Sequence, residues 1–167
     1  MAIKANLVIG SDGATTKNGS SKELSSAADR ARFHKLRENI SAILIGGNTA
    51  RTEPYATTPV QLVIVSATNQ IPKDVRNNPL AIVWNISPLE AVMRIQDEFG
   101  EEILVEGGPE LVQELLDGDV IDELFITQTS ISSGENQVSL RKITEGFDEI
   151  SREEVSGDLF LHFRRER

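Results

Sequence analysis

Short, mostly apolar runs recur along this chain, and the segments between them are long enough to hold helices. The runs occupy residues 3–9, 42–45, 60–65, 80–84, 103–105 and 121–129. Runs that lack regular polar alternation are typical of strands buried on both faces. Strands that alternate with helices favour a largely parallel sheet with helices on both faces. We therefore expect an α/β fold.

Two of the intervening segments carry helix start signals. Ser26 and Asp29 form an approximate capping box, and Ser87-Pro88-Leu89-Glu90 offers a cap, a first-turn proline and a glutamate in capping-box order. The first helix should expose its basic residues, which are Arg30, Arg32, His34, Lys35 and Arg37. The second should bury its apolar residues, which are Leu89, Val92, Met93 and Phe99.

Three segments lack a periodic pattern. Residues 14–22 are small and polar and should form a mobile surface loop, residues 48–59 should form a polar loop, and residues 132–149 should be irregular. Residues 154–164 alternate, which predicts one late, half-exposed antiparallel strand whose edge could pair with a second copy. The expected sheet is therefore mixed.

Length and composition favour one ordinary domain, residues 1–167, without a linker or internal repeat. The absence of cysteine excludes disulfides and a thiol nucleophile, and it fits a cytoplasmic protein. A net charge of −9 argues against non-specific nucleic-acid binding, and no apolar run reaches membrane-spanning length. Residues 1–55 are nevertheless rich in Lys and Arg, so an anionic ligand is expected against the first third.

Glycine-bearing turns follow three of the expected strands, at residues 10–13, 46–49 and 106–109. In open α/β sheets, ligands bind beyond the carboxyl ends of the strands, so these turns mark a candidate site. None of them is a phosphate loop ending in Gly-Lys-Ser/Thr or the usual dinucleotide fingerprint, and no hydrolase Gly-x-Ser-x-Gly elbow occurs. The two histidines, His34 and His162, lack metal-ligand spacing, so no metal site is expected.

The turn at residues 106–109 has the strongest chemical pattern. Glu106 precedes Gly107 and Gly108, which allow close approach of a ligand, and Pro109 suits the first position of a helix. The helix amides and dipole could bind an anion there. The alternative is that Gly-Gly-Pro serves only the geometry of a strand-to-helix turn.

Five ordered pieces of the chain resemble one family. They are Asp12-Gly13, Gly19-Ser20-Ser21, His34-Lys35-Leu36-Arg37, Gly46-Gly47-Asn48-Thr49 with Glu53-Pro54, and Val105-Glu106-Gly107-Gly108-Pro109. This order resembles the NADPH-dependent pyrimidine reductase domain of bacterial riboflavin biosynthesis, over about residues 6–124. The resemblance implies a dihydrofolate-reductase-like fold, NADPH as cofactor, a phosphoribosylamino-pyrimidine substrate reduced to its ribityl form, and a homodimer.

Site residues follow from the resemblance and from the chemistry of the turns. Substrate contacts are implied for Ser21, Arg37 and Glu106, and cofactor contacts for Thr49, Glu53, Ser66, Gly107, Gly108, Pro109, Glu110 and Leu111. Ser66 and Thr68 could donate to an adenosine 2′-phosphate, and Arg51 is a further phosphate partner that the family pattern does not include. Glu106 and Asp12 are the candidate catalytic carboxylates. Asp12 could equally be a turn residue, and Arg37 an ordinary surface arginine.

Departures from the family pattern keep other functions open. Relatives carry a phosphate-binding arginine shortly after the acid-Pro, and none follows Glu53-Pro54 here, although Lys17, Lys22 or Arg37 could replace it. The deaminase domain fused to many relatives is also not expected. The alternatives are a reductase of the same fold that acts on another small molecule, and a nucleotide-binding or assembly module without turnover.

Overall fold

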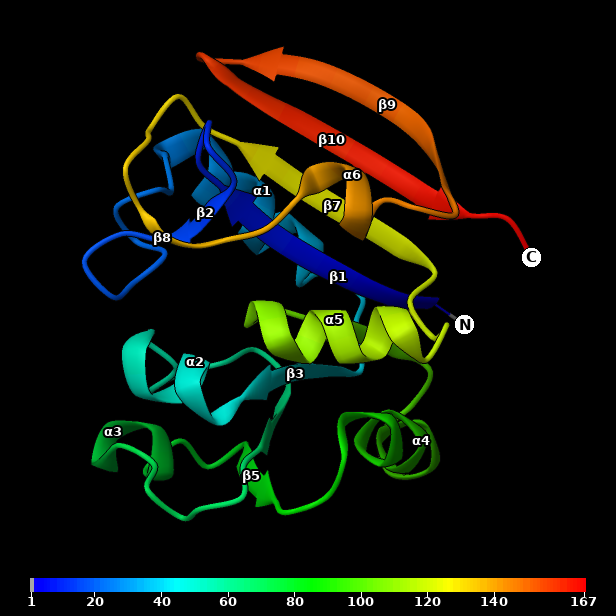
Figure 1. Ribbon diagram of the computed structural model, residues 1–167. Helices are drawn as coiled ribbons and strands as arrows, with labels where there is room; N and C mark the ends of the chain where they lie inside the picture. Colours follow the sequence, from blue (N-terminus) through cyan, green and yellow to red (C-terminus); the bar gives the residue numbers. More distant parts are fainter. Residues whose placement is uncertain (1) are drawn as a thin grey trace.

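One mixed sheet organises the computed structural model, which describes residues 2–167 (Figure 1). Its eight strands have the order β5-β4-β3-β6-β1-β7-β10-β9. They are β5 (Ala81–Trp84), β4 (Gln61–Val65), β3 (Ala42–Gly46), β6 (Glu102–Val105), β1 (Ala2–Ile9), β7 (Glu123–Gln128), β10 (Asp158–Arg165) and β9 (Phe147–Val155). Neighbours from β5 to β7 pair in parallel, and β10 is antiparallel to both of its neighbours. The expected mixed, mostly parallel sheet is confirmed.

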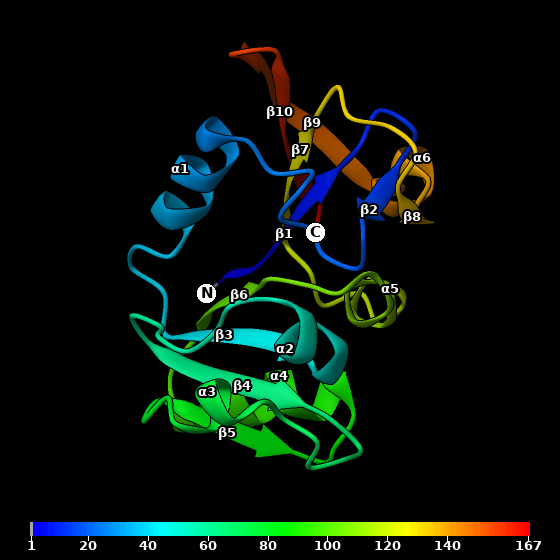
Figure 2. The same cartoon turned by 90° about the vertical axis from the view of Figure 1, so that its left-hand side faces the viewer.

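Helices lie on both faces of the sheet, with α1 on the opposite side from α5 and α6 (Figure 2). They are α1 (Ala27–Leu36), α2 (Gly47–Thr52), α3 (Lys73–Arg76), α4 (Pro88–Glu98), α5 (Pro109–Asp117) and α6 (Leu140–Ile143). α4 packs beside α5. The carboxyl ends of the parallel strands face α2 and α3, toward the left of Figure 1.

The core has one cluster on each face of the sheet. The larger cluster packs β1, β6 and β7 against α4 and α5, through Ile95 and Leu115 among others. The smaller cluster packs β3 and β4 against the segment after β3 and α3, through Ala50, Tyr55 and Val75. The continuous apolar strands are buried because both of their faces are covered.

The helix start signals are confirmed. Ser26 Oγ accepts a hydrogen bond from the Asp29 amide at 3.0 Å, and Ser87 and Glu90 form a reciprocal capping box. α5 starts at Pro109, as predicted. The expected burial of Met93 is wrong, since 65% of this residue is exposed and α4 buries Ala91, Val92 and Ile95 instead.

Arg32 does not lie on a solvent face, as the sequence suggested. Its guanidinium donates to the Ile126 carbonyl at 3.0 Å and to the Leu161 carbonyl at 2.8 Å, and it lies 4.7 Å from the centre of the Phe160 ring. α1 therefore attaches to β7 and β10 partly through a guanidinium, which explains why its apolar stripe is weak.

The three segments expected to lack regular structure each contain some. β2 (Ala14–Thr16) pairs with β8 (Glu135–Gln137) in a separate two-stranded sheet. Residues 48–59 begin inside α2, and residues 132–149 include α6. The β2–β8 pairing joins distant segments, and a local sequence pattern carries no signal for it.

The chain end forms a hairpin and not a single strand. β9 and β10 are joined at Ser156 and Gly157, whose φ angles are 52° and 86°. Positive φ at both central residues is the geometry of a two-residue hairpin turn. The edge strand at this end of the sheet is therefore β9, whereas the alternating strand β10 lies inside the sheet.

Among the described residues, no helix combines the length and the apolar character that crossing a bilayer requires.

Candidate functional site

Two of the three glycine turns meet at the carboxyl edge of the sheet. β3 and β6 are neighbours, so the Gly46 amide donates to the Gly107 carbonyl at 3.3 Å and the Glu106 amide donates to the Leu44 carbonyl at 3.1 Å. The turn at residues 10–13 follows β1, which is the next strand beyond β6. The structure thus places the turns at the edge where ligands bind in open α/β sheets.

The start of α5 leaves donors without a helical partner. Gly107 has a φ of +121°, which favours glycine, and Gly108 caps the helix without a side-chain hydrogen bond. The Val112 amide donates to the Gly108 carbonyl at 3.0 Å. Val112 makes the first intrahelical hydrogen bond of α5, so the amides of Glu110 and Leu111, which come before it in the chain, have no acceptor within the helix.

Thr49 of α2 faces this helix start. A Cβ atom at Gly107 would lie 3.6 Å from Thr49 Oγ1, and one at Gly108 would lie 3.3 Å from it. Thr49 is 9% exposed, and its hydroxyl makes no hydrogen bond to any of residues 2–167 and is open to solvent. A hydroxyl with no protein partner beside two glycines and two open amides forms a cradle suited to a phosphate oxygen. We call Thr49, Gly107, Gly108 and the Glu110 and Leu111 amides the glycine cradle.

Glu106 is the centre of a buried hydrogen-bond network. Arg37 donates to it twice, from Nε to Oε1 and from Nη2 to Oε2, each at 2.7 Å, and the Tyr55 hydroxyl donates to Oε2 at 2.7 Å. The Glu106 side chain is 0% exposed and that of Arg37 is 12% exposed. Burial and the nearby Glu106 charge raise the pKa of Tyr55 well above its usual value, so its hydroxyl stays a donor.

Local structure positions each member of this network. Arg37 is the C-cap residue of α1, and its guanidinium lies 4.4 Å from the centre of the Phe33 ring. Burial alone lowers the pKa of Arg37, but the hydrogen bonds and charge of Glu106 more than offset this, so the pKa is raised. Asn78 Nδ2 donates to the Tyr55 carbonyl at 3.2 Å and so fixes the loop that carries Tyr55.

This network changes the expected role of Glu106. The sequence suggested that its carboxylate touches the substrate, but here both oxygens are bound by protein donors and the side chain is covered. Arg37 neutralises the carboxylate and Tyr55 adds a hydrogen bond to it, and the side chain is covered, so direct contact with a ligand is not available in this arrangement. Tyr55 and Asn78 were missed because no local sequence pattern marks them.

Glu53 ties the loop of residues 17–22 to the end of α2. Its Oε1 accepts from the Ser21 amide at 2.6 Å and from the Ser20 hydroxyl at 3.2 Å. The structure thus brings Ser21 to Glu53, while the Glu53 carboxylate is used inside the protein. Lys17 is directed elsewhere, since its ammonium donates to the Ser132 carbonyl at 3.1 Å.

Arg51 and Ser66 lie beside Gly47, one strand away from the glycine cradle. A Cβ atom at Gly47 would lie 2.7 Å from Ser66 Oγ and 3.1 Å from Arg51 Nη1. The Ser66 hydroxyl donates to the Thr68 carbonyl at 2.8 Å and accepts from the Thr68 amide at 3.3 Å. The Ser66 hydroxyl therefore donates within its own loop, whereas the sequence predicted that it donates to a ligand phosphate.

Asp12 is placed as a turn residue. Its carboxylate accepts from the Ala14 amide at 3.1 Å and from the Ser133 amide at 2.9 Å. The hydrogen bond from the Ala14 amide has the largest effect on the Asp12 carboxylate and lowers its pKa, and the bond from Ser133 lowers the pKa by a smaller amount. These contacts join the loops at the start of β2 and before β8, which favours the structural interpretation over the catalytic one.

A shallow pocket of about 420 Å³ opens beside Arg37. Its lining residues are His34, Arg37, Glu38, Thr57, Thr58 and Pro59. His162 lies elsewhere and contacts Glu123 at 2.6 Å. Among residues 2–167, no group of three or more His, Cys, Asp or Glu side chains is arranged to hold a metal ion.

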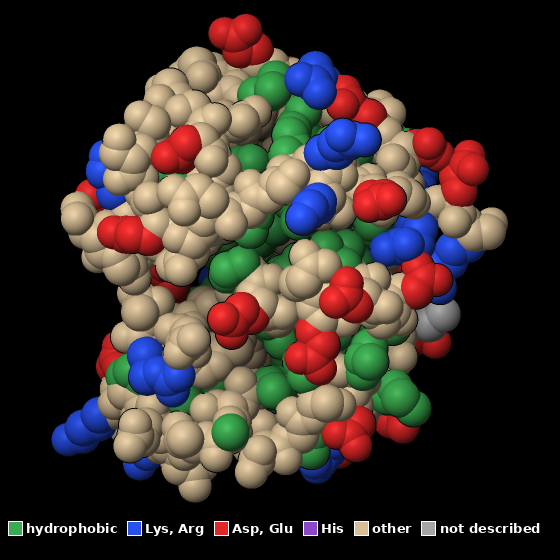
Figure 3. Space-filling model, in the orientation of Figure 1, with side chains coloured by type: hydrophobic (Ala, Val, Ile, Leu, Met, Phe, Trp, Pro, Cys, Tyr) green, Lys and Arg blue, Asp and Glu red, His purple; other side chains and the backbone are tan. Residues whose placement is uncertain are grey.

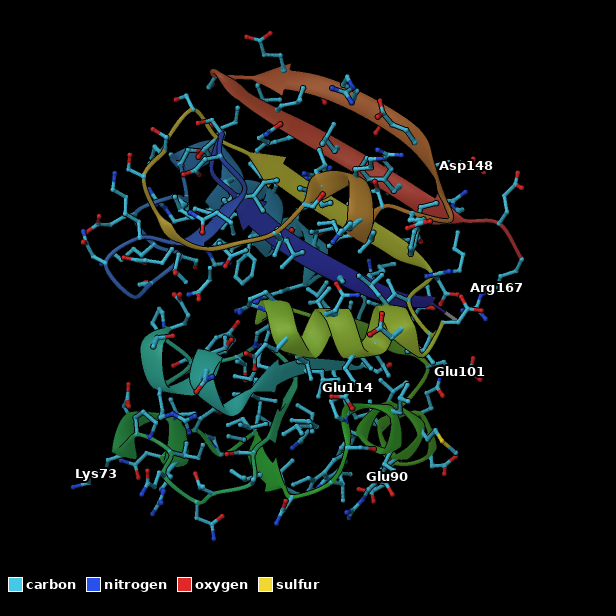
Figure 4. The ribbon with its side chains drawn as sticks, in the orientation of Figure 1. Lys73, Glu90, Glu101, Glu114, Asp148 and Arg167 are labelled. Atoms are coloured by element: carbon cyan, nitrogen blue, oxygen red, sulfur yellow. The ribbon has the colours of Figure 1, made fainter. Side chains whose placement is uncertain are left out.

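Charge is unevenly distributed around the site (Figure 3). Acidic side chains gather over α4 and α5, where Figure 4 labels Glu90 and Glu114, and basic side chains gather at the α3 corner, where it labels Lys73. An anion at the sheet edge would therefore meet a positive potential toward α3 and a negative one toward the outer face of α5.

Comparison with solved structures gives matches along the whole chain. The fold matches RibD from Acinetobacter baumannii with a TM-score of 0.77 at 16% identity, covering 99% of this chain and 58% of that one. It matches a diaminohydroxyphosphoribosylaminopyrimidine deaminase/5-amino-6-(5-phosphoribosylamino)uracil reductase from Thermotoga maritima with a TM-score of 0.74 at 16% identity, covering 99% and 56%. A pyrimidine reductase-like protein from Corynebacterium diphtheriae gives a TM-score of 0.75 at 15% identity, covering 99% and 92%.

The first two of these proteins are longer, and the chain spans little more than half of each. None of the curated proteins matches the sequence significantly. The fold class is confirmed as dihydrofolate-reductase-like. The family profile described as the RibD C-terminal domain matches residues 2–149, and the chain belongs to this family.

Proposed function

We propose that this protein is an NADPH-dependent reductase of riboflavin biosynthesis. Its substrate would be 5-amino-6-(5-phosphoribosylamino)uracil or a close diaminopyrimidine relative, whose ribosyl group is reduced to the ribityl form. Membership of the RibD C-terminal domain family supports a role in riboflavin biosynthesis. The glycine cradle is the observation that supports a dinucleotide cofactor.

The residues of the cradle fit a dinucleotide. The Glu110 and Leu111 amides and the Thr49 hydroxyl would donate to the pyrophosphate, and the two glycines leave room for its close approach. Glu110 would act through its amide, because its carboxylate opposes an anion. When bound, NADPH would supply a hydride, which carries both electrons and one of the two hydrogens gained, while the second hydrogen would be gained as a proton from solvent; the protein's part is to orient the reacting groups.

The substrate would lie between Ser21 and Arg37. Arg37 lines the pocket beside α1, and the Ser21 loop is held by Glu53, two residues before the Tyr55 that shares the Glu106 carboxylate with Arg37. Glu106 would act as a positioning residue, because it fixes the Arg37 guanidinium through two parallel hydrogen bonds. Arg37 could then present its remaining N–H groups to the substrate.

The burial of Glu106 also favours a second candidate, a nucleotide-binding module without turnover. The carboxylate that the family pattern assigns to the substrate is enclosed, and no arginine follows Pro54 in residues 55–59. This candidate predicts intact coenzyme binding together with no reaction of the pyrimidine.

Coenzyme titration followed by a turnover assay separates these candidates. The purified protein would be titrated with NADPH and NADH, and NADPH oxidation would then be followed after addition of the phosphoribosylamino-pyrimidine. Binding with turnover supports the reductase. Binding without turnover supports either another substrate or the module, and no binding of either coenzyme refutes the proposed function.

We also propose a cytoplasmic homodimer. β9 is one of the two outer strands of the sheet and exposes Ile150, which is 49% accessible, so it offers an edge for pairing. Light scattering during size exclusion would give the mass in solution, and a monomeric mass at assay concentration would contradict the assembly.

A further inference from the structure

Two guanidinium groups converge on one loop beyond the carboxyl end of β4. Arg51 donates from Nη2 to Asn48 Oδ1 at 2.5 Å and from Nη1 to the Gln70 carbonyl at 3.4 Å. Arg76 of α3 donates from Nη2 to the Asn69 carbonyl. Because these two carbonyls belong to consecutive residues, both guanidinium groups are attached to the same short stretch of this loop. We call Arg51 and Arg76 the arginine pair.

The arginine pair has no acidic partner. Within the described part of the chain, no Asp or Glu forms an ion pair with either guanidinium, and the acceptors of their hydrogen bonds are neutral amide oxygens. Asp74 is on the same short helix, two residues before Arg76, and residues two apart do not share a helix face. Both arginines are exposed in a chain of net charge −9. A bound anion would relieve the repulsion between them.

The arginine pair lies in line with the glycine cradle along the sheet edge. Gly46 of β3 is hydrogen-bonded to Gly107 after β6, and Gly46 is also in register with Val65 at the end of β4. Adjacent strands are about 5 Å apart. A dinucleotide whose pyrophosphate occupies the cradle can therefore extend its adenosine across β3 toward the arginine pair.

We propose that Arg51 and Arg76 bind the adenosine 2′-phosphate of the coenzyme and thereby select NADPH over NADH. This inference rests on the proposed function, which places a dinucleotide at the cradle. The ligand chemistry is a phosphate monoester, which a guanidinium fork binds with paired hydrogen bonds. Arginine is also the usual neighbour of a coenzyme 2′-phosphate in dinucleotide sites. Ser66 shapes the loop through its bonds to Thr68 and does not donate to the ligand.

The test compares probes with and without a 2′-phosphate. Binding of NADPH, NADH, 2′,5′-ADP and 5′-AMP would be measured by calorimetry for the wild-type protein and for the variants Arg51→Gln and Arg76→Gln. Arg94→Gln is the matched control, because Arg94 is an exposed helical arginine that is paired with Glu98 on α4. Thermal melts would establish that each variant is folded.

Each substitution in the pair should weaken the binding of NADPH and of 2′,5′-ADP by about 10- to 100-fold, which is the range expected for the loss of hydrogen bonds to a charged group. Binding of NADH and 5′-AMP should be unchanged, and Arg94→Gln should bind all four probes as the wild type does. Equal losses for NADPH and NADH, or no loss in either variant, would overturn the proposal.

Failure of the proposed function would look different. A wild-type protein that binds neither coenzyme refutes the reductase, and 2′,5′-ADP then decides the arginine pair separately. Binding of 2′,5′-ADP that both substitutions weaken supports the pair as a phosphate-monoester site. No binding of 2′,5′-ADP to the wild type overturns it.

Discussion

Arg37 binds Glu106 through two parallel hydrogen bonds of 2.7 Å, although the two residues are 69 positions apart in the sequence. The pair connects the C-terminal end of α1 to the end of β6 across the site edge. Tyr55 adds a third donor to the same carboxylate. Removing a single partner leaves the buried Glu106 charge uncompensated and lowers the free energy of unfolding, so single substitutions can test the network.

Replacing Arg37 by Met should destabilise the protein by about 3–5 kcal/mol, because it leaves the Glu106 charge buried without its cation. The double variant Arg37→Met with Glu106→Gln should lose much less than the sum of the two single losses. Urea unfolding of the four proteins in this cycle measures the coupling. Additive losses would show that the pair does not act as a unit.

Tyr55 should resist ionisation in the folded protein. It is the only tyrosine, so the near-ultraviolet absorbance of tyrosinate reports on it alone. Burial and Glu106 raise its pKa in the folded state, so its contribution to stability is complete below pH about 10 and is lost as the pH rises further. Absorbance and circular dichroism would be followed together during alkaline titration.

The two signals should change together as the chain unfolds, whereas the urea-unfolded chain should titrate near pH 10. Ionisation near that pH in a protein that is still folded would contradict the buried network. Tyr55→Phe removes the absorbance signal and serves as the spectroscopic blank.

Gly107→Ala should impair coenzyme binding and cost about 1–3 kcal/mol of stability, because its φ of +121° disfavours a side chain. Gly157→Ala is the matched control: its φ is +86°, no atom lies within 4 Å of the added Cβ, and it is located in the β9–β10 hairpin. Both variants should lose stability, and only Gly107→Ala should lose affinity for NADPH. Equal affinities in calorimetry would remove Gly107 from the cradle.

Glu106→Gln should reduce turnover far more than coenzyme affinity. The glutamine cannot accept both Arg37 hydrogen bonds, so the guanidinium would no longer be held in its orientation. Steady-state kinetics and NADPH titration of the same preparation measure the two effects. Unchanged turnover would exclude the positioning role.

Arg32→Gln should destabilise the protein by about 1–3 kcal/mol, because two strand carbonyls lose a charged donor. Arg30→Gln on the same helix is the control, since Arg30 is exposed and donates only to the nearby Ser25 carbonyl. Thermal unfolding compares them. Equal melting temperatures for the two variants would show that Arg32 does not anchor α1.

The local elements of this protein were determined by its sequence. Apolar runs without alternation predicted the parallel strands, and the Ser26 and Ser87 caps and Pro109 predicted where three helices begin. The Gly107–Gly108 sequence predicted the tight turn between β6 and α5. These signals depend on the φ preferences, hydrogen bonds and burial of residues that are close in the chain.

Only the tertiary structure decided which distant groups meet. Three features join segments that no local pattern connects: the pairing of β2 with β8, the enclosure of Glu106 by Arg37 and Tyr55, and the attachment of Arg51 and Arg76 to one loop. The environments of Met93 and Arg32 were also not predictable from the sequence. Periodicity assigns a residue to a face of its helix, but it does not say which element packs against that face. Side-chain partners are fixed by the packing of whole elements, and the sequence specifies that packing only through the complete fold.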